Sequence, residues 1–124
     1  MSKKVLIVDD NSTMRGTLRG LLQQAGITEV SETQDGETAL QMLCESPYDL
    51  VISDDEMPSM SGLQLLKAIR ADDDLRATPF IMVTMSNSQD KAMAARQAGV
   101  SSYIVKPFTA DALKSKIERV VGTI

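Results

Sequence analysis

The sequence contains no histidine, no tryptophan and a single cysteine among its 124 residues. Without histidine the chain lacks the commonest general base and the commonest metal ligand, so any metal site must use oxygen ligands and bind a hard cation. One cysteine, Cys44, excludes an internal disulfide framework, which agrees with a cytoplasmic location. Beside Leu43 on an expected helix, Cys44 is interpreted as a small buried apolar side chain.

The chain also lacks the features of membrane, secreted and nucleic-acid-binding proteins. No apolar run approaches the roughly 20 residues that a membrane span requires, and the N-terminal sequence has no signal-peptide pattern. The formal net charge is −4 and the aromatic residues are two tyrosines and two phenylalanines. This composition argues against electrostatic attraction to nucleic acid and against base stacking. We therefore expect a cytoplasmic protein with no nucleic-acid or membrane partner.

Strand-like and helix-like segments alternate along the whole chain, with no linker, repeat or low-complexity tract. The strand-like runs are short and apolar, which is typical of strands buried on both faces. They cover residues 5–8, a weaker segment around Val30, and residues 49–53, 80–84 and 103–105. Apolar residues at helical spacing follow each run, over 14–25, 39–43, 61–70, 88–98 and 113–121.

Capping residues mark several of the expected helix ends. Asn11 or Ser12 is expected to cap the first helix, Ser61 to Gln64 has the form of a capping box, and Gly99 closes the fourth helix. Five strands, each followed by a helix, imply a five-stranded parallel sheet with helices on both faces. Right-handed crossovers then make residues 1–124 a single doubly wound α/β domain.

The most polar residues of the chain follow its strands. Ligands of a doubly wound fold bind beyond the carboxyl ends of the strands, near the point where strand order reverses. The residues expected there are Asp9 and Asp10 after the first strand, Asp54, Asp55 and Glu56 after the third, Thr84 at the end of the fourth, and Lys106-Pro107 after the fifth. We therefore expect carboxylates, a hydroxyl and an ammonium group at one edge of the sheet.

This combination suits phosphoryl chemistry. Clustered carboxylates raise one another's pKa values, and a divalent cation relieves the repulsion. Mg²⁺ is the natural choice because it prefers oxygen ligands and often uses one or two carboxylates with a phosphate oxygen. A carboxylate can itself be the nucleophile that forms an aspartyl phosphate. Mg²⁺, the Lys106 ammonium and the Thr84 hydroxyl would together position and neutralise the phosphoryl group.

Each of these residues also has an ordinary structural interpretation when taken alone. An acidic pair after a strand is often a turn or a helix cap. Thr84 could bond the backbone at its strand end, and Lys106 could be a solvated surface side chain. The functional interpretation rests on the combination, because an acidic cluster, a threonine and a Lys-Pro pair, each after its own strand, would rarely arise together by chance.

Longer stretches around these strand ends form a pattern that covers essentially the whole chain. They are Ile7–Asp10 with Ser12–Arg15, Val51–Asp54 with Met57-Pro58, Gly62-Leu63 through Leu66-Lys67, Ile69–Asp72, Met82–Thr84, and Gly99 through Thr109. Jointly these stretches resemble the receiver domains of response regulators, and the CheY-like chemotaxis regulators especially. The resemblance implies a flavodoxin-like sheet with strand order 2-1-3-4-5.

The resemblance also implies a phosphorylation site centred on Asp54, which would accept a phosphoryl group from a histidine kinase. Asp10 and Asp54 would ligate Mg²⁺ directly. The backbone carbonyl of Glu56 would complete this set, and Asp9 would assist through water. Lys106 would pair with the phosphoryl oxygens, and its bond to the following proline resembles the family's cis peptide.

A switch is implied as well. Thr84 and Tyr103 match the family's switch pair, in which the hydroxyl moves toward the phosphate and the ring turns inward. Phosphorylation would bias a two-state equilibrium and remodel the surface of the fourth helix, fifth strand and fifth helix. The expected output is protein binding by a monomer, which is no enzyme beyond catalysing its own phosphorylation and autodephosphorylation.

Several partners and functions stay open at this point. The CheY likeness suggests a CheA-like kinase and a flagellar motor switch protein, while a stand-alone phosphorelay or stress-signalling receiver would share all site residues. A hydrolase with an aspartyl-phosphate intermediate wants a second Asp two residues after the nucleophile, where Glu56 stands. A flavodoxin-like cofactor carrier would need a phosphate cradle where Asp9 and Asp10 would repel one.

Two residues depart from the CheY-like pattern. Glu56 stands where these proteins usually carry Asn, and it could pair with Lys106 at rest or hinder the hydrolytic water. Met85 replaces a small residue after Thr84 and should crowd the phosphoryl group. We therefore expect slower phosphotransfer from small donors and slower autodephosphorylation than in a typical CheY-like protein. Asp55 is expected to face solvent.

Overall fold

The five expected strands pair into one parallel sheet in the computed structural model, which describes residues 3–85 and 87–122. The strands are β1 (Lys4–Val8), β2 (Glu29–Thr33), β3 (Leu50–Asp54), β4 (Phe80–Thr84) and β5 (Ser102–Val105). Their order is β2-β1-β3-β4-β5, so the predicted order is confirmed. After β2 the chain crosses back over β1 and adds β3 on the other side of β1. The strand order therefore reverses between β1 and β3, which are direct neighbours.

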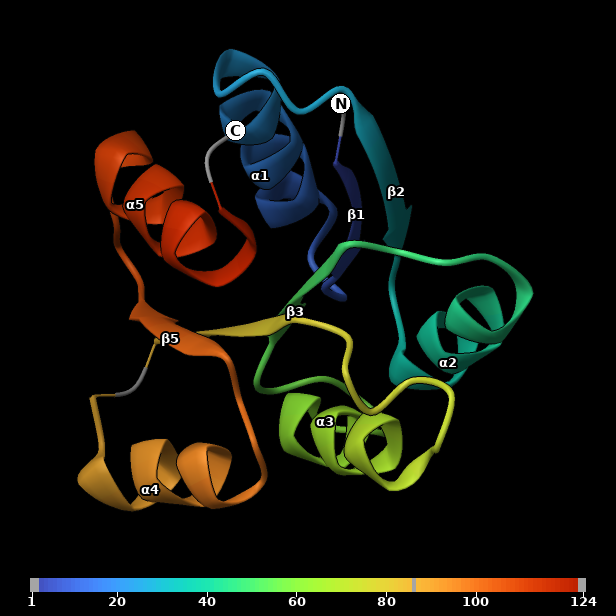
Figure 1. The fold of residues 1–124 in the computed structure, drawn as a ribbon. Coiled ribbons are helices and arrows are strands. Elements are labelled where there is room, and N and C mark those ends of the chain that lie inside the picture. The colour runs from blue at the N-terminus through green and yellow to red at the C-terminus, as the bar shows by residue number, and fades with distance from the viewer. Residues whose placement is uncertain (1–2, 86, 123–124) are drawn as a thin grey trace.

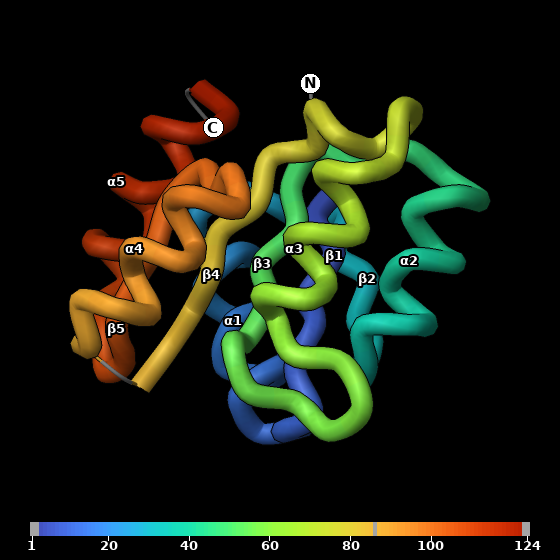
Figure 2. The backbone as a smooth tube through the Cα atoms, turned by 90° about the horizontal axis from the view of Figure 1, so that it is seen from below, coloured from blue at the N-terminus to red at the C-terminus, as the bar shows by residue number. Residues whose placement is uncertain are grey.

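Five helices cover the sheet on both faces. They are α1 (Ser12–Gln24), α2 (Gly36–Glu45), α3 (Gly62–Ala71), α4 (Gln89–Gln97) and α5 (Ala110–Val121). Helices α1 and α5 lie on one face of the sheet, and α2, α3 and α4 lie on the other (Figure 1). Figure 2 looks onto the second face, with these three helices in front of the strands. Within the described ranges, no helix is long and apolar enough to cross a membrane.

Strand β1 contributes to both apolar cores through the alternation of its side chains. Val5 and Ile7 pack into the core on the α1 and α5 side, and Leu6 and Val8 pack into the core on the α2 and α3 side. All four side chains are fully buried. Because β1 is buried on both faces, the two cores fix the position of Asp9, which directly follows it.

The predicted helix caps are present. The Asn11 side chain accepts a hydrogen bond from the Met14 backbone N–H at 3.1 Å, which selects Asn11 as the N-cap of α1. Ser61 and Gln64 make both bonds of the capping box. Gly99 follows α4 with a φ of 93°, a left-handed conformation that glycine adopts without strain. These caps set the points at which the loops beside the site enter their helices.

One core prediction was wrong. Cys44 is exposed. Helix α2 buries Ala39 and Leu43 on its inner face, and a residue one position after Leu43 is rotated by about 100° around the helix axis, away from that face. The apolar character of cysteine therefore did not decide its place.

Candidate functional site

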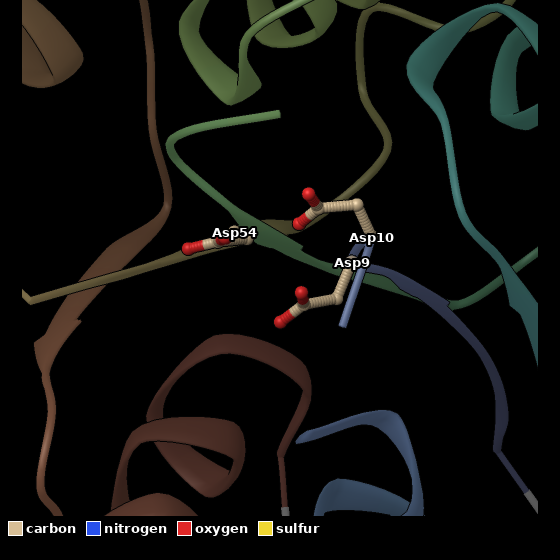
Figure 3. A group of neighbouring side chains, drawn as sticks. All are labelled: Asp9, Asp10 and Asp54. Atoms are coloured by element: carbon tan, nitrogen blue, oxygen red, sulfur yellow. The ribbon is translucent and has the colours of Figure 1, made fainter. Parts of the chain in front are cut away.

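Three carboxylates meet at the carboxyl ends of β1 and β3. One oxygen each from Asp9, Asp10 and Asp54 lies within 4.8 Å of the others. The side chains point to the same side of the sheet edge (Figure 3). Asp9 is only 1% exposed, whereas Asp54 is half-buried and Asp10 is exposed. This all-oxygen donor set fits a small hard cation such as Mg²⁺, whose ligands are carboxylates, carbonyls and water.

The backbone around Asp54 is held by several local contacts. Asp54 is the last residue of β3 and pairs with Val83 of β4. The Asp55 N–H donates to Asp54 Oδ1 at 3.0 Å, and the buried Ser53 hydroxyl donates to the Asp54 carbonyl at 2.9 Å. A Cβ atom at Gly62 would lie 2.2 Å from the same carbonyl oxygen. The loop after β3 can therefore return this close to Asp54 only with glycine at the start of α3.

Lys106 supplies the positive charge of the site. Its Nζ lies 3.4 Å from Asp54 Oδ1 and 4.0 Å from Asp9 Oδ2, and its side chain is 14% exposed. The Lys106 N–H donates to the Thr84 carbonyl at 2.7 Å, which continues the pairing of β5 with β4. The bond to Pro107 is cis, as the resemblance implied. The ammonium group is thus held against two carboxylates.

Burial and repulsion shift the titration of these carboxyl groups. Burial, followed by repulsion from Asp9, raises the pKa of Asp54 to about 6, although attraction to Lys106 opposes the rise. Burial also raises the pKa of Asp9 above its ordinary value. The direction agrees with the expectation that clustered carboxylates raise one another's pKa values. A bound cation would favour the charged form of each group.

The environment of Thr84 corrects the prediction for Asp55. Thr84 is fully buried, and its Oγ1 donates to Asp55 Oδ2 at 2.6 Å. The Asp55 side chain is only 16% exposed, so the expectation that it faces solvent was wrong. The Asp55 N–H donates to the Val83 carbonyl at 3.0 Å, which extends the β3–β4 pairing by one residue. This pairing keeps the Asp55 side chain beside the end of β4.

The Glu56 side chain pairs with a residue that the sequence did not suggest. Its Oε1 lies 2.9 Å from Nζ of Lys91 on α4, and the same Nζ lies 3.9 Å from Asp55 Oδ2. The expected resting pair of Glu56 with Lys106 is absent from the described residues, because Lys106 is already held against the carboxylates of Asp9 and Asp54. Glu56 therefore contacts α4 instead of the ammonium group beside Asp54.

A small cleft of about 180 Å³ opens next to Asp54. Its lining residues are Asp54, Asp55, Glu56, Thr84, Met85 and Lys106. Met85 is 79% exposed and is one of the residues that line this cleft. The structure thus brings together in one cleft the predicted acceptor, the predicted hydroxyl, the predicted ammonium group and both residues predicted to tune the site.

Tyr103 is not among the described residues that line this cleft. It packs against the core on the α2 and α3 side, and it lines a neighbouring cavity of about 380 Å³ together with Met82 and Ala95 and with Asp55 and Glu56 of the loop after β3. Its hydroxyl is buried and makes no hydrogen bond with the residues that the structure describes. The two members of the predicted switch pair are therefore in different surroundings, since Thr84 lines the cleft and Tyr103 lies beneath α4.

Sequence reasoning missed Lys91 and misplaced Asp55. Lys91 is one of several charged residues on α4, and no local pattern separates it from the others. Its role depends on the position of α4 relative to the loop after β3, which is a tertiary property. Asp55 did carry a signal, because a residue directly after the last residue of a buried strand can continue the strand pairing and stay beside the site.

The sheet order, the acidic cluster and the ammonium group beside Asp54 define a receiver domain. The model of the response regulator receiver domain family matches residues 5–118, and the chain belongs to this family. Its sequence is 49% identical to the chemotaxis protein CheY of Pseudomonas aeruginosa over 117 residues, which cover 94% of each chain.

Solved structures agree with this assignment. Chemotaxis protein CheY4 of Vibrio cholerae superimposes with a TM-score of 0.90 at 35% identity, covering 97% of this chain and 99% of that one. The receiver domain of a sensor histidine kinase from Pseudomonas aeruginosa superimposes with a TM-score of 0.89 at 27% identity, covering 98% and 99%. That receiver domain was solved with a magnesium ion coordinated in its active-site cleft.

Proposed function

We propose that this receiver domain is a single-domain response regulator that accepts a phosphoryl group on Asp54. The observation that carries the proposal is the contact of the half-buried Asp54 carboxylate with Lys106, at 3.4 Å, within a cluster of two further carboxylates. Carboxyl groups whose pKa values are shifted and which lie beside a positively charged side chain in a cleft are typical of reactive sites. Membership of the receiver family supports the same assignment.

In the proposed reaction, an Asp54 carboxylate oxygen attacks the phosphorus of a phosphohistidine. The new P–O bond forms as the P–N bond breaks, and the imidazole leaves as a neutral ring because the other ring nitrogen of the phosphohistidine already carries a proton. Lys106 would pair with a phosphoryl oxygen, and the Thr84 hydroxyl would donate to another. Such positioning and charge neutralisation are what phosphoryl transfer chiefly requires. The protein would act on itself only, as a switch and not as an enzyme that turns over a substrate.

The proposed metal ligands are the carboxylates of Asp10 and Asp54 and the backbone carbonyl of Glu56, with Asp9 assisting through water. The separation of the three carboxylate oxygens supports this set. When bound, Mg²⁺ would neutralise charge on the phosphoryl oxygens. The magnesium ion in the related kinase receiver domain also supports the choice of metal.

The proposed output is phosphorylation-dependent binding of another protein. Movement of the Thr84 hydroxyl toward the phosphoryl group, with a change at Tyr103, would alter the surface of α4, β5 and α5. The Tyr103 hydroxyl is buried without a hydrogen-bond partner among the described residues, and this supports a role for the side chain in two arrangements, since a buried polar group without a partner calls for an explanation. We further propose that the protein works in the cytoplasm as a monomer.

A role in chemotaxis is the proposed pathway. The 49% identity with a CheY protein supports a CheA-like kinase as donor and a flagellar motor switch protein as target. A stand-alone phosphorelay or stress-signalling receiver is the second candidate. It is supported by the likeness to the receiver domain of a sensor histidine kinase. Binding to a motor switch peptide, measured with and without beryllofluoride, separates the two. Beryllofluoride-dependent binding supports chemotaxis, and its absence supports the second candidate.

Beryllofluoride, which mimics the phosphoryl group on aspartate, tests the proposed function itself. Tyr103 fluorescence is followed as Mg²⁺ and then beryllofluoride are added, in a Tyr48→Phe background that removes the other tyrosine. We expect a saturable change that requires both ligands and is lost in the Asp54→Asn variant. No response in the parent protein, or an equal response in the variant, would contradict the proposal.

A further inference from the structure

The Thr84 hydroxyl is already engaged in the structure, by a residue that the family pattern does not single out. It donates to Asp55 Oδ2 at 2.6 Å, which is the short distance of a charge-assisted O–H···O⁻ bond. Both partners are shielded from solvent, since Thr84 is fully buried and the Asp55 side chain is 16% exposed. A shielded bond of this kind is stronger than one in water.

A hydroxyl has one proton to donate. Under the proposed function, on which this inference rests, the same proton is needed by an oxygen of the phosphoryl group on Asp54. The carboxylate of Asp55 and the phosphoryl group therefore compete for Thr84. We propose that Asp55 is a positioning residue that holds the Thr84 hydroxyl in the resting state and must release it on phosphorylation.

The surroundings of Asp55 explain why it can hold this position. Its backbone is fixed on both sides, by the N–H bond to the Val83 carbonyl and by the Gly62 N–H, which donates to the Asp55 carbonyl at 3.0 Å. The oxygen that accepts from Thr84 also lies 3.9 Å from Nζ of Lys91 on α4. Release of Thr84 leaves the Asp55 carboxylate facing Lys91. The proposed competition thus connects the acceptor site with α4 through Asp55 and Lys91, in addition to the proposed connection through Tyr103.

The test measures the affinity for beryllofluoride, in the presence of Mg²⁺, of the parent, the Asp55→Asn and Thr84→Val variants and the variant with both substitutions, which form a double-mutant cycle. Asp55→Asn keeps the shape and weakens the acceptor, and Thr84→Val removes the hydroxyl. Asp55→Asn also removes a negative charge near an anion. Glu56→Gln is the matched control, because it removes a neighbouring charge without contacting Thr84 and keeps the backbone carbonyl.

We expect Asp55→Asn to tighten beryllofluoride binding about fivefold more than Glu56→Gln does, since a neutral acceptor holds the hydroxyl less strongly than a carboxylate. In the Thr84→Val background Asp55→Asn should tighten binding about fivefold less than it does in the parent, because no hydroxyl is left to release and only the effect of the lost charge remains. An Asp55→Asn effect of the same size in both backgrounds would overturn the inference. So would an effect no larger than that of Glu56→Gln.

A measurement on the unaltered protein guards against variants that fold poorly. Three-bond coupling constants report the Thr84 χ1 rotamer, which should differ before and after beryllofluoride is added. An unchanged rotamer would overturn the inference. The two proposals fail separately. The proposed function is wrong if the parent protein does not bind beryllofluoride, or if the Asp54→Asn variant binds it as tightly as the parent does. If binding requires Asp54 but the cycle shows no coupling, only the role of Asp55 is wrong.

Discussion

Two lysine–carboxylate clusters contribute side chains to the region around Asp54, and they differ mainly in burial. The inner cluster consists of Lys106, Asp9 and Asp54, whose side chains are 14%, 2% and 12% exposed. The outer cluster consists of Lys91, Asp55 and Glu56, whose side chains are 47%, 16% and 78% exposed. The residue types are nearly the same, so burial decides how strongly each cluster can act on a group in the cleft.

In the inner cluster, charges interact with little screening, and the loss of one partner leaves the others buried and unpaired. In the outer cluster, water and salt screen the pair of Lys91 with Glu56, and such pairs contribute little to stability. The inner cluster is therefore suited to chemistry. The outer cluster is suited to adjustment, through the single shielded contact that Asp55 makes. Substitutions in each cluster test this division of roles between the inner and the outer cluster.

The largest effect is expected from Lys106→Met, which removes the ammonium group beside Asp54. The initial rate of phosphorylation by a small phosphoryl donor should fall about a hundredfold, the usual cost of removing one preorganised group that stabilises transition-state charge. Lys91→Met is the matched control in the outer cluster and should change the rate by no more than about threefold. Similar losses in the two variants would contradict the division.

The next effect is on stability. The folded-state pKa of Asp54 is about 6, above the unfolded value of 3.8, so ionised Asp54 destabilises the metal-free fold above that pH. At pH 7 without Mg²⁺, Asp54→Asn should raise the free energy of unfolding by about 3 kcal/mol. The gain should shrink as the pH falls through 6 and be nearly lost near pH 4, where the native carboxyl is also neutral. Urea unfolding measures both, and equal stabilities at pH 7 would count against the argument.

Binding of Mg²⁺ should reverse part of this destabilisation. At a Mg²⁺ concentration ten times its dissociation constant, the free energy of unfolding of the parent protein should rise by about 1.4 kcal/mol. Asp10→Asn removes one of the proposed ligands, so the same Mg²⁺ concentration should stabilise this variant much less. A rise that is equal in the parent and the Asp10→Asn variant would indicate binding elsewhere.

Met85 lines the cleft beside Asp54, to which both clusters contribute side chains. Replacing it with alanine should speed autodephosphorylation and phosphorylation by small donors, by less than about tenfold, because better access adds no catalytic group. Loss of phosphoryl label over time measures the first rate. A Met85→Ala variant that decays no faster than the parent would contradict a steric role for this side chain.

The smallest effect is expected from Lys91→Gln. Its ion pair with Glu56 is exposed, so denaturant unfolding should show no change beyond experimental error, and added salt should alter the parent and the variant alike. A clear loss of stability in Lys91→Gln would mean that the outer cluster is less screened than its exposure implies.

Most of the fold could be predicted from the sequence, because buried parallel strands and capped helices have strong local patterns. The apolar run Phe80–Thr84 became β4 with the expected bounds, and the Ser61–Gln64 capping box began α3. The acidic cluster could also be predicted, since strand order alone brings Asp9, Asp10 and Asp54 to one edge of the sheet.

The contacts that could not be predicted depend on side-chain directions and on helix placement. Asp55 is next to Asp54 in the sequence, but its contact with Thr84 depends on how far the β3–β4 pairing extends. Lys91 meets Glu56 only because α4 lies close to the loop after β3. Cys44 is exposed because of its angular position on α2. Local composition carries little information on any of these.

We propose that the inner cluster forms a phosphorylation site with Asp54 as the acceptor. The most direct test treats the protein with phosphoramidate and Mg²⁺, digests it quickly, and locates the phosphoryl group by peptide mass spectrometry. We expect one phosphoryl group, on the peptide that contains Asp54, and none in the Asp54→Asn variant. A phosphoryl group on a different residue, or equal labelling of the variant, would contradict it.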